Sequence, residues 1–110
     1  MSFEARPNIP QDFKNQIRMS GDNSPATLTG DVDDYNPTGA SSASVLRIDG
    51  GASGRNITGL VGGFDGRIIT ILNVGTTNSL TLVQQSTSSV AANRFICPND
   101  GNVVIRLNGG

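Results

Sequence analysis

From Tyr35 to Leu107, the sequence is a series of short apolar runs separated by residues that favour turns. The runs are four to eight residues long and recur about every ten residues, a spacing that leaves no room for amphipathic helices between them. Glycine, asparagine and aspartate mark the breaks, as in Asp49-Gly50-Gly51 and Asn99-Asp100-Gly101. The pattern predicts β-strands at 43–48, 56–61, 67–74, 79–84, 94–97 and 102–107.

Strands of this length and spacing are typical of β-sandwiches and barrels. Parallel neighbours need a crossover connection, usually a helix, and the sequence has no helical pattern between its runs. We therefore expect an all-β fold, a small antiparallel β-sandwich or jelly-roll-like barrel.

The run 67–74 differs from the others because it is apolar on both faces. Ile69 and Ile71 alternate with Ile68, Leu72 and Val74. This pattern is typical of a central strand that is covered on both sides. The second apolar face could be covered by a neighbouring sheet or by another subunit, and we expect the neighbouring sheet.

The chain divides near residue 35. Residues 1–34 hold six of the nine acidic residues and three of the five prolines, and their apolar residues follow no sustained period. Pro10, Phe13 and Ile17 could form about two helical turns, which is too short to be stable alone. We predict an extended N-terminal arm at 1–34 and a β-sandwich domain at 35–110.

The composition argues against catalysis. The chain has no His and one Cys, so a nucleophilic thiol at Cys97 would lack its usual base. Asp49, Asp65 and Asp100 are the carboxylates of the β domain, and each precedes glycine, as in hairpin turns. We therefore expect no enzyme activity, no catalytic residue and no cofactor, and we interpret Cys97 as a small apolar filler of the core.

Two motifs resemble ligand sites without matching them. The segment 31–36 has the alternating oxygens of a calcium loop, but Asn36 and Ser42 stand where such a loop needs Gly and Glu. The glycines of 59–66 precede no helix, which a phosphate-binding loop requires. We expect a solvated acidic turn and ordinary turn glycines, and therefore no metal site.

Charge and hydropathy exclude two further classes of partner. Eight basic residues face nine acidic ones, and the arginines are scattered singly, so nothing predicts nucleic-acid binding. No segment is long and apolar enough to span a membrane, and the first residues lack the apolar region of a signal peptide. We expect synthesis in a host cytoplasm and no membrane partner.

The core predicted from this composition is thin. Hydrophobic residues make up 35% of the chain, and a chain of 110 residues buries only about two thirds of its unfolded surface. Association with other subunits is a common remedy for such a small core. We therefore expect a homo-oligomer.

A series of short motifs resembles a β module of tailed-bacteriophage virion proteins. The motifs extend over roughly residues 31–107 and include Asp34-Tyr35-Asn36-Pro37-Thr38-Gly39, Gly63-Phe64-Asp65-Gly66-Arg67 and Ala91-Ala92-Asn93-Arg94-Phe95. The module occurs in head-decorating or head-fibre proteins and in tail-fibre-like proteins. The resemblance implies a further strand, with an aromatic residue near its end, after Leu107. Without that strand, a sheet edge would be open to a neighbouring subunit.

A short arm before one β domain favours a capsid decoration or cement protein among these roles. The arm would bind the major capsid protein on the outer surface of the phage head, and the β domain would form a homotrimer that bridges capsomers. Apolar and arginine side chains are the anchors that such an arm would use. The candidate anchors are Phe3, Arg6, Ile9, Phe13, Ile17 and Arg18.

The alternative is a structural or receptor-binding module of a tail fibre or tailspike. Loops 49–55 and 84–90 would then touch a host polysaccharide. Sugar sites commonly present aromatic faces, and Tyr35 and Phe64 are the candidates in this chain.

Overall fold

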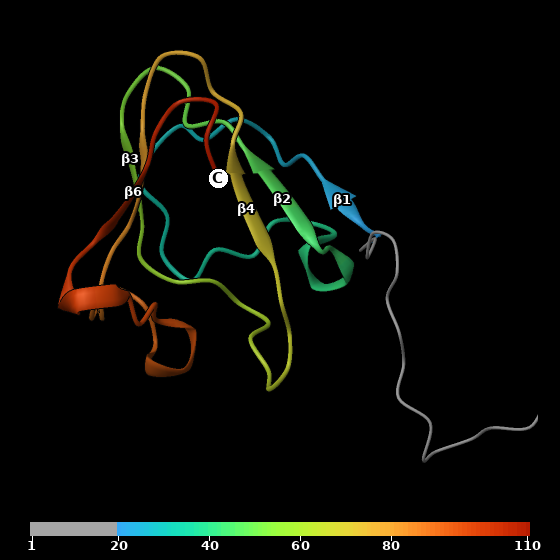
Figure 1. Ribbon diagram of the computed structural model, residues 1–110, viewed down its shortest axis with the longest axis vertical. Coiled ribbons are helices and arrows are strands. Elements are labelled where there is room, and N and C mark those ends of the chain that lie inside the picture. Colours follow the sequence, from blue (N-terminus) through green and yellow to red (C-terminus); the bar gives the residue numbers. More distant parts are fainter. Residues whose placement is uncertain (1–19) are drawn as a thin grey trace, which may run out of the picture.

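The computed structural model describes residues 20–110, which form two three-stranded sheets (Figure 1). The first sheet has the order β1-β2-β4 and the second the order β3-β5-β6. The strands are β1 (Asp22–Asn23), β2 (Val45–Ile48), β3 (Arg55–Ile57), β4 (Thr70–Asn73), β5 (Leu80–Leu82) and β6 (Val103–Ile105). Short 3-10 turns lie at η1 (Ala40–Ser42), η2 (Ala91–Asn93) and η3 (Pro98–Asp100).

Most strand pairs are parallel, with a constant offset along the chain. Val45 pairs with Thr70 and Arg55 with Leu80, so paired residues are separated by the same length of chain in both sheets. The bridge between Val32 and Ile57 has this offset too, and the pairing of β1 with β2 has a slightly shorter one. The chain therefore winds as a short β-solenoid, in which each circuit, here called a coil, contributes one segment to each sheet.

The predicted antiparallel sandwich is wrong. The prediction excluded parallel pairing because it assumed that a crossover between parallel strands needs a helix. Here the chain alternates between the sheets instead, from β2 to β3, then to β4 and to β5. The strand in one sheet is thus part of the crossover that joins two parallel strands of the other sheet, and no helix is needed.

Three predicted strands also differ from the structure. Of the run 56–61, only residues 56 and 57 belong to a strand, β3. The run 67–74 is not central, because β4 lies at the edge of its sheet. The segment 94–97 forms no strand and makes only single bridges, from Arg94 to Gly59 and from Phe95 to Gln84. The runs 43–48, 79–84 and 102–107 do contain β2, β5 and β6.

The core lies between the two sheets. Leu46 and Ile48 of β2 are 0% and 1% exposed, and they face Ile57 and Leu80 of the second sheet, which are equally buried. Alternation along β2 leaves Val45 and Arg47 on the outer face. Leu28 joins this core, so part of the segment assigned to the arm packs in the first coil.

The C-terminal residues reverse the direction of the chain. β6 runs antiparallel to β5, with Leu80 opposite Ile105. The segment 106–110 then passes from the second sheet toward the first, where Gly109 pairs antiparallel with Asn73 (Figure 1). The C-terminal segment thus covers part of the last coil.

Candidate interaction surface

The capsid anchors predicted from the sequence lie outside the described residues. They are Phe3, Arg6, Ile9, Phe13, Ile17 and Arg18, whereas the structure describes residues 20–110. Their role stays a prediction. The surface that follows is built from the β domain.

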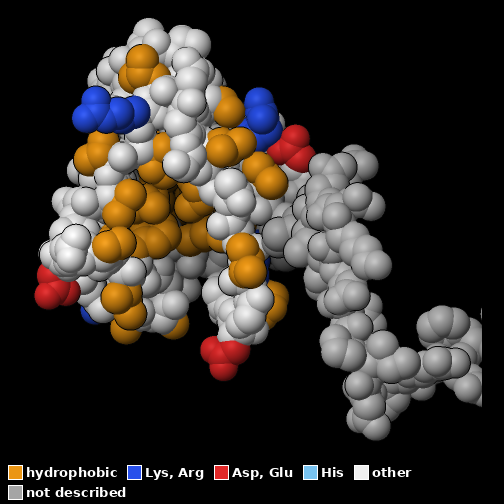
Figure 2. Space-filling view, viewed as in Figure 1, with side chains coloured by type: hydrophobic (Ala, Val, Ile, Leu, Met, Phe, Trp, Pro, Cys, Tyr) orange, Lys and Arg blue, Asp and Glu red, His pale blue; other side chains and the backbone are white. Residues whose placement is uncertain are grey.

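The last coil exposes part of the apolar interior. The register turns Ile71 to the same side as buried Leu46, and Leu82 to the same side as buried Ile57, yet Ile71, Leu82 and Val103 are only partly buried. Figure 2 shows apolar side chains gathered in a hollow between the two walls of the molecule. We call this surface the open end and define it by these residues: Leu60, Phe64, Ile69, Ile71, Leu82, Phe95 and Val103.

The open end includes a pocket between segments 60–69 and 92–95. Leu60, Ile69 and Phe95 supply its apolar walls, and its volume is about 190 Å³. Phe64 stands at its rim with 68% of its surface exposed, and Ile96 nearby in sequence is 82% exposed. Fully burying a side chain of this size stabilises a protein by about 1.5–3 kcal/mol. The surface therefore favours association with another apolar surface.

Arg67 fixes the loop that forms one wall of this pocket. Its guanidinium donates to the carbonyl oxygens of Gly62, Ala40 and Ala43, at 2.7, 2.6 and 3.1 Å. Its Cζ atom lies 5.8 Å from the centre of the Phe64 ring, within the range of a cation–π contact. The exposed ring is therefore held in place by a side chain that is itself tied to the backbone.

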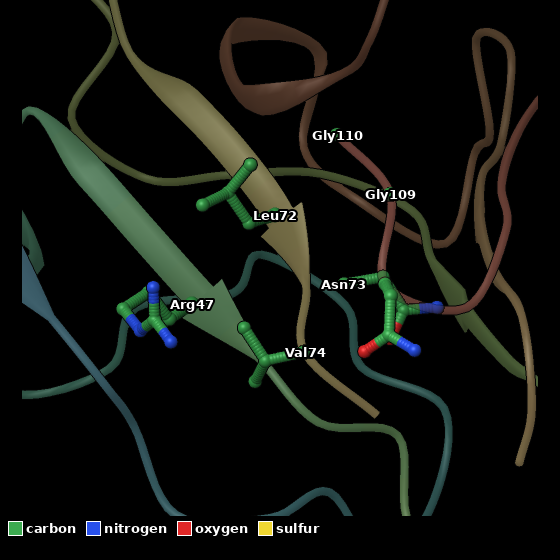
Figure 3. A pocket seen from close by; sticks show the side chains of 7 residues that line it. Arg47, Leu72, Asn73, Val74, Gly109 and Gly110 are labelled. Atoms are coloured by element: carbon green, nitrogen blue, oxygen red, sulfur yellow. The ribbon is translucent and has the colours of Figure 1, made fainter. Parts of the chain in front are cut away.

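A second pocket lies where the C-terminal segment passes β4. Its lining includes Arg47, Leu72, Val74, Gly109 and Gly110, and its volume is about 360 Å³. Figure 3 shows these residues around the pocket. Arg47 and Leu72 are opposite each other in the register, so both belong to the outer face of the first sheet. This pocket therefore opens outside the core, behind the strand that borders the open end.

Asn73 attaches the C-terminal segment to β4. Its side-chain amide donates to the carbonyl oxygens of Asn78 and Ile105 at 3.0 and 3.1 Å, and its Oδ1 accepts from the Gly75 N–H at 2.9 Å. Its backbone N–H donates to the Gly109 carbonyl at 2.6 Å. Asn73 is 1% exposed, so these bonds satisfy a polar group that would otherwise be costly to bury.

The predicted acidic turn at 31–36 holds neighbouring coils together. Thr58 Oγ1 donates to Asp33 Oδ1 at 2.6 Å and lies 2.7 Å from Ser89 Oγ. The Asp34 carboxylate accepts from the Val90 N–H at 3.0 Å. The acids of this turn thus bond to segments of the next two coils rather than facing only solvent.

Two carboxylates of the predicted turns accept hydrogen bonds, one within its own turn and one from another segment. Asp49 accepts from the Gly51 N–H at 2.9 Å, as a turn aspartate does. Asp100 accepts from the Gln84 side chain at 3.3 Å. Among residues 20–110, no three His, Cys, Asp or Glu side chains lie together as ligands for a metal ion.

The two aromatic side chains considered for sugar binding have different environments. Tyr35 is buried, and burial raises the pKa of its phenol above the usual value. Phe64 alone of the two presents an exposed ring, and Arg67 covers part of it. The described part of the chain also has no helix of the length and hydropathy needed to cross a membrane.

No family model, curated protein or solved structure matches this chain. The resemblance to phage virion modules therefore stays a prediction from the motifs.

Sequence reasoning did not find the open end as a site. The two-faced apolar pattern of 67–74 is not a signal for it, because Ile71 lies on the core side of the sheet and Leu72 on its outer face. The recurrence of apolar pairs at one offset, as in Leu46 and Ile71 or Ile57 and Leu82, would have indicated the coils. It would also have placed β4 in the last coil.

Proposed function

We propose that this chain is a structural protein of a bacteriophage particle and that it works by binding, without catalysis. The proposed role is that of a decoration or cement protein on the outer surface of the head. The β domain associates with other copies, three being the expected number. Residues of the arm bind the major capsid protein and so link neighbouring capsomers.

The observation that supports an assembly role is the open end. It is lined by apolar side chains, including Ile69, Ile71 and Phe95, and most of them are only partly buried. Soluble proteins commonly keep contiguous apolar surface for contact with a partner. Several copies bound to one lattice through weak arms hold far more tightly than one copy, which suits a cement protein.

Removal of residues 1–20 tests the attachment step. We expect the truncated protein to keep its fold and oligomeric state but to lose binding to phage heads in a co-sedimentation assay. A full-length variant with Phe3, Phe13 and Ile17 changed to Ser serves as the matched control for chain length. Each buried anchor contributes about 1 kcal/mol or more, so this variant should bind roughly 100-fold more weakly.

Unchanged binding of both proteins would contradict attachment through the arm. Labelled antibody on intact particles shows whether the protein lies on the head or on the tail. Label confined to the tail would contradict the decoration role and favour the tail-fibre alternative.

A further inference from the structure

We propose that Asp65 is a site of spontaneous isomerisation to isoaspartate, and that this modification loosens the rim of the open end as the protein ages. The inference concerns the chemistry of one turn and does not depend on the proposed function. The sequence places glycine directly after aspartate three times, at Asp49, Asp65 and Asp100. Glycine has no Cβ atom, so its backbone nitrogen can approach the preceding carboxyl group closely.

Isomerisation at an aspartate–glycine pair releases one molecule of water and takes one up again. The Gly66 nitrogen bonds to Cγ of Asp65 and loses its proton, and a carboxyl oxygen leaves as water to give a cyclic succinimide. Water then adds to the backbone carbonyl carbon of the ring, and the bond from that carbon to the nitrogen breaks. The chain now continues through Cγ, the former backbone carbonyl is a free carboxylate, and the mass is unchanged.

Asp65 and Gly66 are the central residues of an exposed turn. The Arg67 N–H donates to the Phe64 carbonyl at 3.1 Å and closes the turn around them. Gly66 has a φ of 83°, the conformation that glycine adopts at the third position of a type II turn. The closing bond uses neither the Asp65 carboxylate nor the Gly66 N–H, and no residue among 20–110 bonds to either group. The two reacting groups can therefore meet while the described coils stay intact.

The pair at Asp49 is held on both sides. Its carboxylate accepts from the Gly51 N–H at 2.9 Å, and its backbone carbonyl accepts from the Leu28 N–H at 2.9 Å. Gly50, whose nitrogen would attack, is buried, whereas Gly66 is exposed. Reaction at Asp49 therefore requires local opening of the first two coils.

The pair at Asp100 is exposed but bonded. The Gly101 N–H donates to the Pro98 carbonyl at 3.3 Å, and the Asp100 carboxylate accepts from the Gln84 side chain at 3.3 Å. The attacking nitrogen and the carboxyl group are thus both engaged elsewhere. The contacts of the three pairs make Asp65 the most reactive of them.

Isomerisation at Asp65 would lengthen the turn by one backbone methylene. Arg67, at one end of the turn, is tied by its guanidinium to the carbonyl oxygens of Gly62, Ala40 and Ala43. Phe64, at the other end, is 68% exposed and lines the pocket of the open end. The added length therefore displaces Phe64 rather than Arg67, and it weakens the hydrogen bond that closes the turn.

Peptide mapping of aged full-length protein tests the reactivity. The protein is kept at neutral pH and physiological temperature for several weeks, and electron-transfer fragmentation locates isoaspartate in its peptides. We expect isoaspartate at Asp65 to accumulate at least roughly tenfold faster than at Asp49 or Asp100, because bonds must open first at those two sites. In urea the three rates should converge, because unfolding removes these bonds.

Two results would overturn the assignment of Asp65. One is a rate at Asp65 in the folded protein that is no higher than the rates at Asp49 and Asp100. The other is an advantage of Asp65 that persists unchanged in urea, because it would then come from the neighbouring residues and not from the fold.

Two variants of the exposed Asp65 side chain test the chemistry and its effect on the rim. Asp65→Glu would have to form a larger ring and should not react, whereas Asp65→Asn should react faster because an uncharged amide is attacked more readily than a carboxylate. Hydrogen exchange of the Arg67 amide reports on the turn. It should be at least roughly tenfold faster in isomerised than in fresh protein and unchanged in aged Asp65→Glu. Equal protection of this amide in isomerised and fresh protein would contradict the loosening of the rim.

Discussion

At the scale of single residues, Asn73 is a polar side chain that stabilises the core at a position where the preceding coil uses an apolar side chain. The register places it beside Ile48 of the preceding coil, on the side of the core. There it bonds to Asn78, Ile105 and Gly75 instead of packing against hydrocarbon. The last coil is therefore stabilised at this position by hydrogen bonds, two of them to Asn78 and Ile105, whereas the preceding coil is stabilised there by the buried side chain of Ile48.

Replacing Asn73 with Leu should lower the free energy of unfolding by about 3 kcal/mol. The variant roughly keeps the side-chain size but leaves the Gly75 N–H and the Ile105 carbonyl without side-chain partners in a buried site. Urea denaturation measures the loss. Asn102→Leu is the control, because Asn102 makes one exposed bond to the Gln84 N–H and should cost about 1 kcal/mol or less. Equal losses in both variants would contradict the role given to Asn73.

At the scale of elements, the solenoid depends on close contact between successive coils. Gly59, in the second coil, lies against segment 89–93, and a Cβ atom there would be 2.5 Å from Ser89 Oγ. The turn at 49–54 is bonded to the next one in the same way, because the Asn78 amide donates to the Gly51 carbonyl at 2.9 Å. The coils are thus held by their loops as well as by strand pairing.

Gly59→Ala should destabilise the protein by about 1–3 kcal/mol, because the added methyl group has no space beside Ser89. Gly63→Ala is the matched control in the same loop, where nothing lies within 4 Å of the new atom. Thermal denaturation of the two variants side by side makes the comparison. A smaller loss for Gly59→Ala than for Gly63→Ala would contradict the coil contact.

Most strand positions could be predicted from the sequence, but their pairing could not. Val45–Ile48 and Leu80–Leu82 are visible as strands because both are short apolar runs bounded by turn residues, a local property. Parallel pairing is decided by where the chain goes between strands, and the glycine-rich turns of this chain resemble hairpin turns. The repeat that indicates the coils is weakened at one position, because Asn73 replaces the apolar residue found at Ile48.

The candidate surface was predictable only in part. The sequence indicated that 67–74 has more apolar faces than one sheet needs. It could not indicate that Ile71 lies at an edge, since that depends on the turn of the chain at 106–110. The arm residues were chosen for their side-chain type alone, and their contacts lie outside the described part of the chain.

At the scale of the whole molecule, a thin core and an exposed apolar hollow belong together. Among residues 20–110 the fully buried large side chains are few, Leu46, Ile48, Ile57 and Leu80 among them, and Phe95 is only partly buried. A domain of this kind gains stability when copies associate, because association is coupled to folding.

The midpoint of thermal unfolding should therefore rise with protein concentration. A tenfold increase adds at least about 0.7 kcal/mol per chain to an associating protein, which corresponds to roughly 3–5 °C for a domain of this size. Calorimetry over a hundredfold range of concentration measures the slope. A flat line for the unmodified protein would contradict association.

The constant offset between paired strands has a consequence during synthesis. Each new strand pairs with a strand that lies one coil earlier in the chain. The earlier strand therefore leaves the ribosome before the strand that pairs with it. The coils can therefore be laid down one after another from the N-terminal side. Residues 103–109 are the exception, because they pair backward against β5 and Asn73, and they leave the ribosome after the coils that they cover. The nascent domain thus stays unfinished, with its final coil uncovered, until translation of these residues is complete.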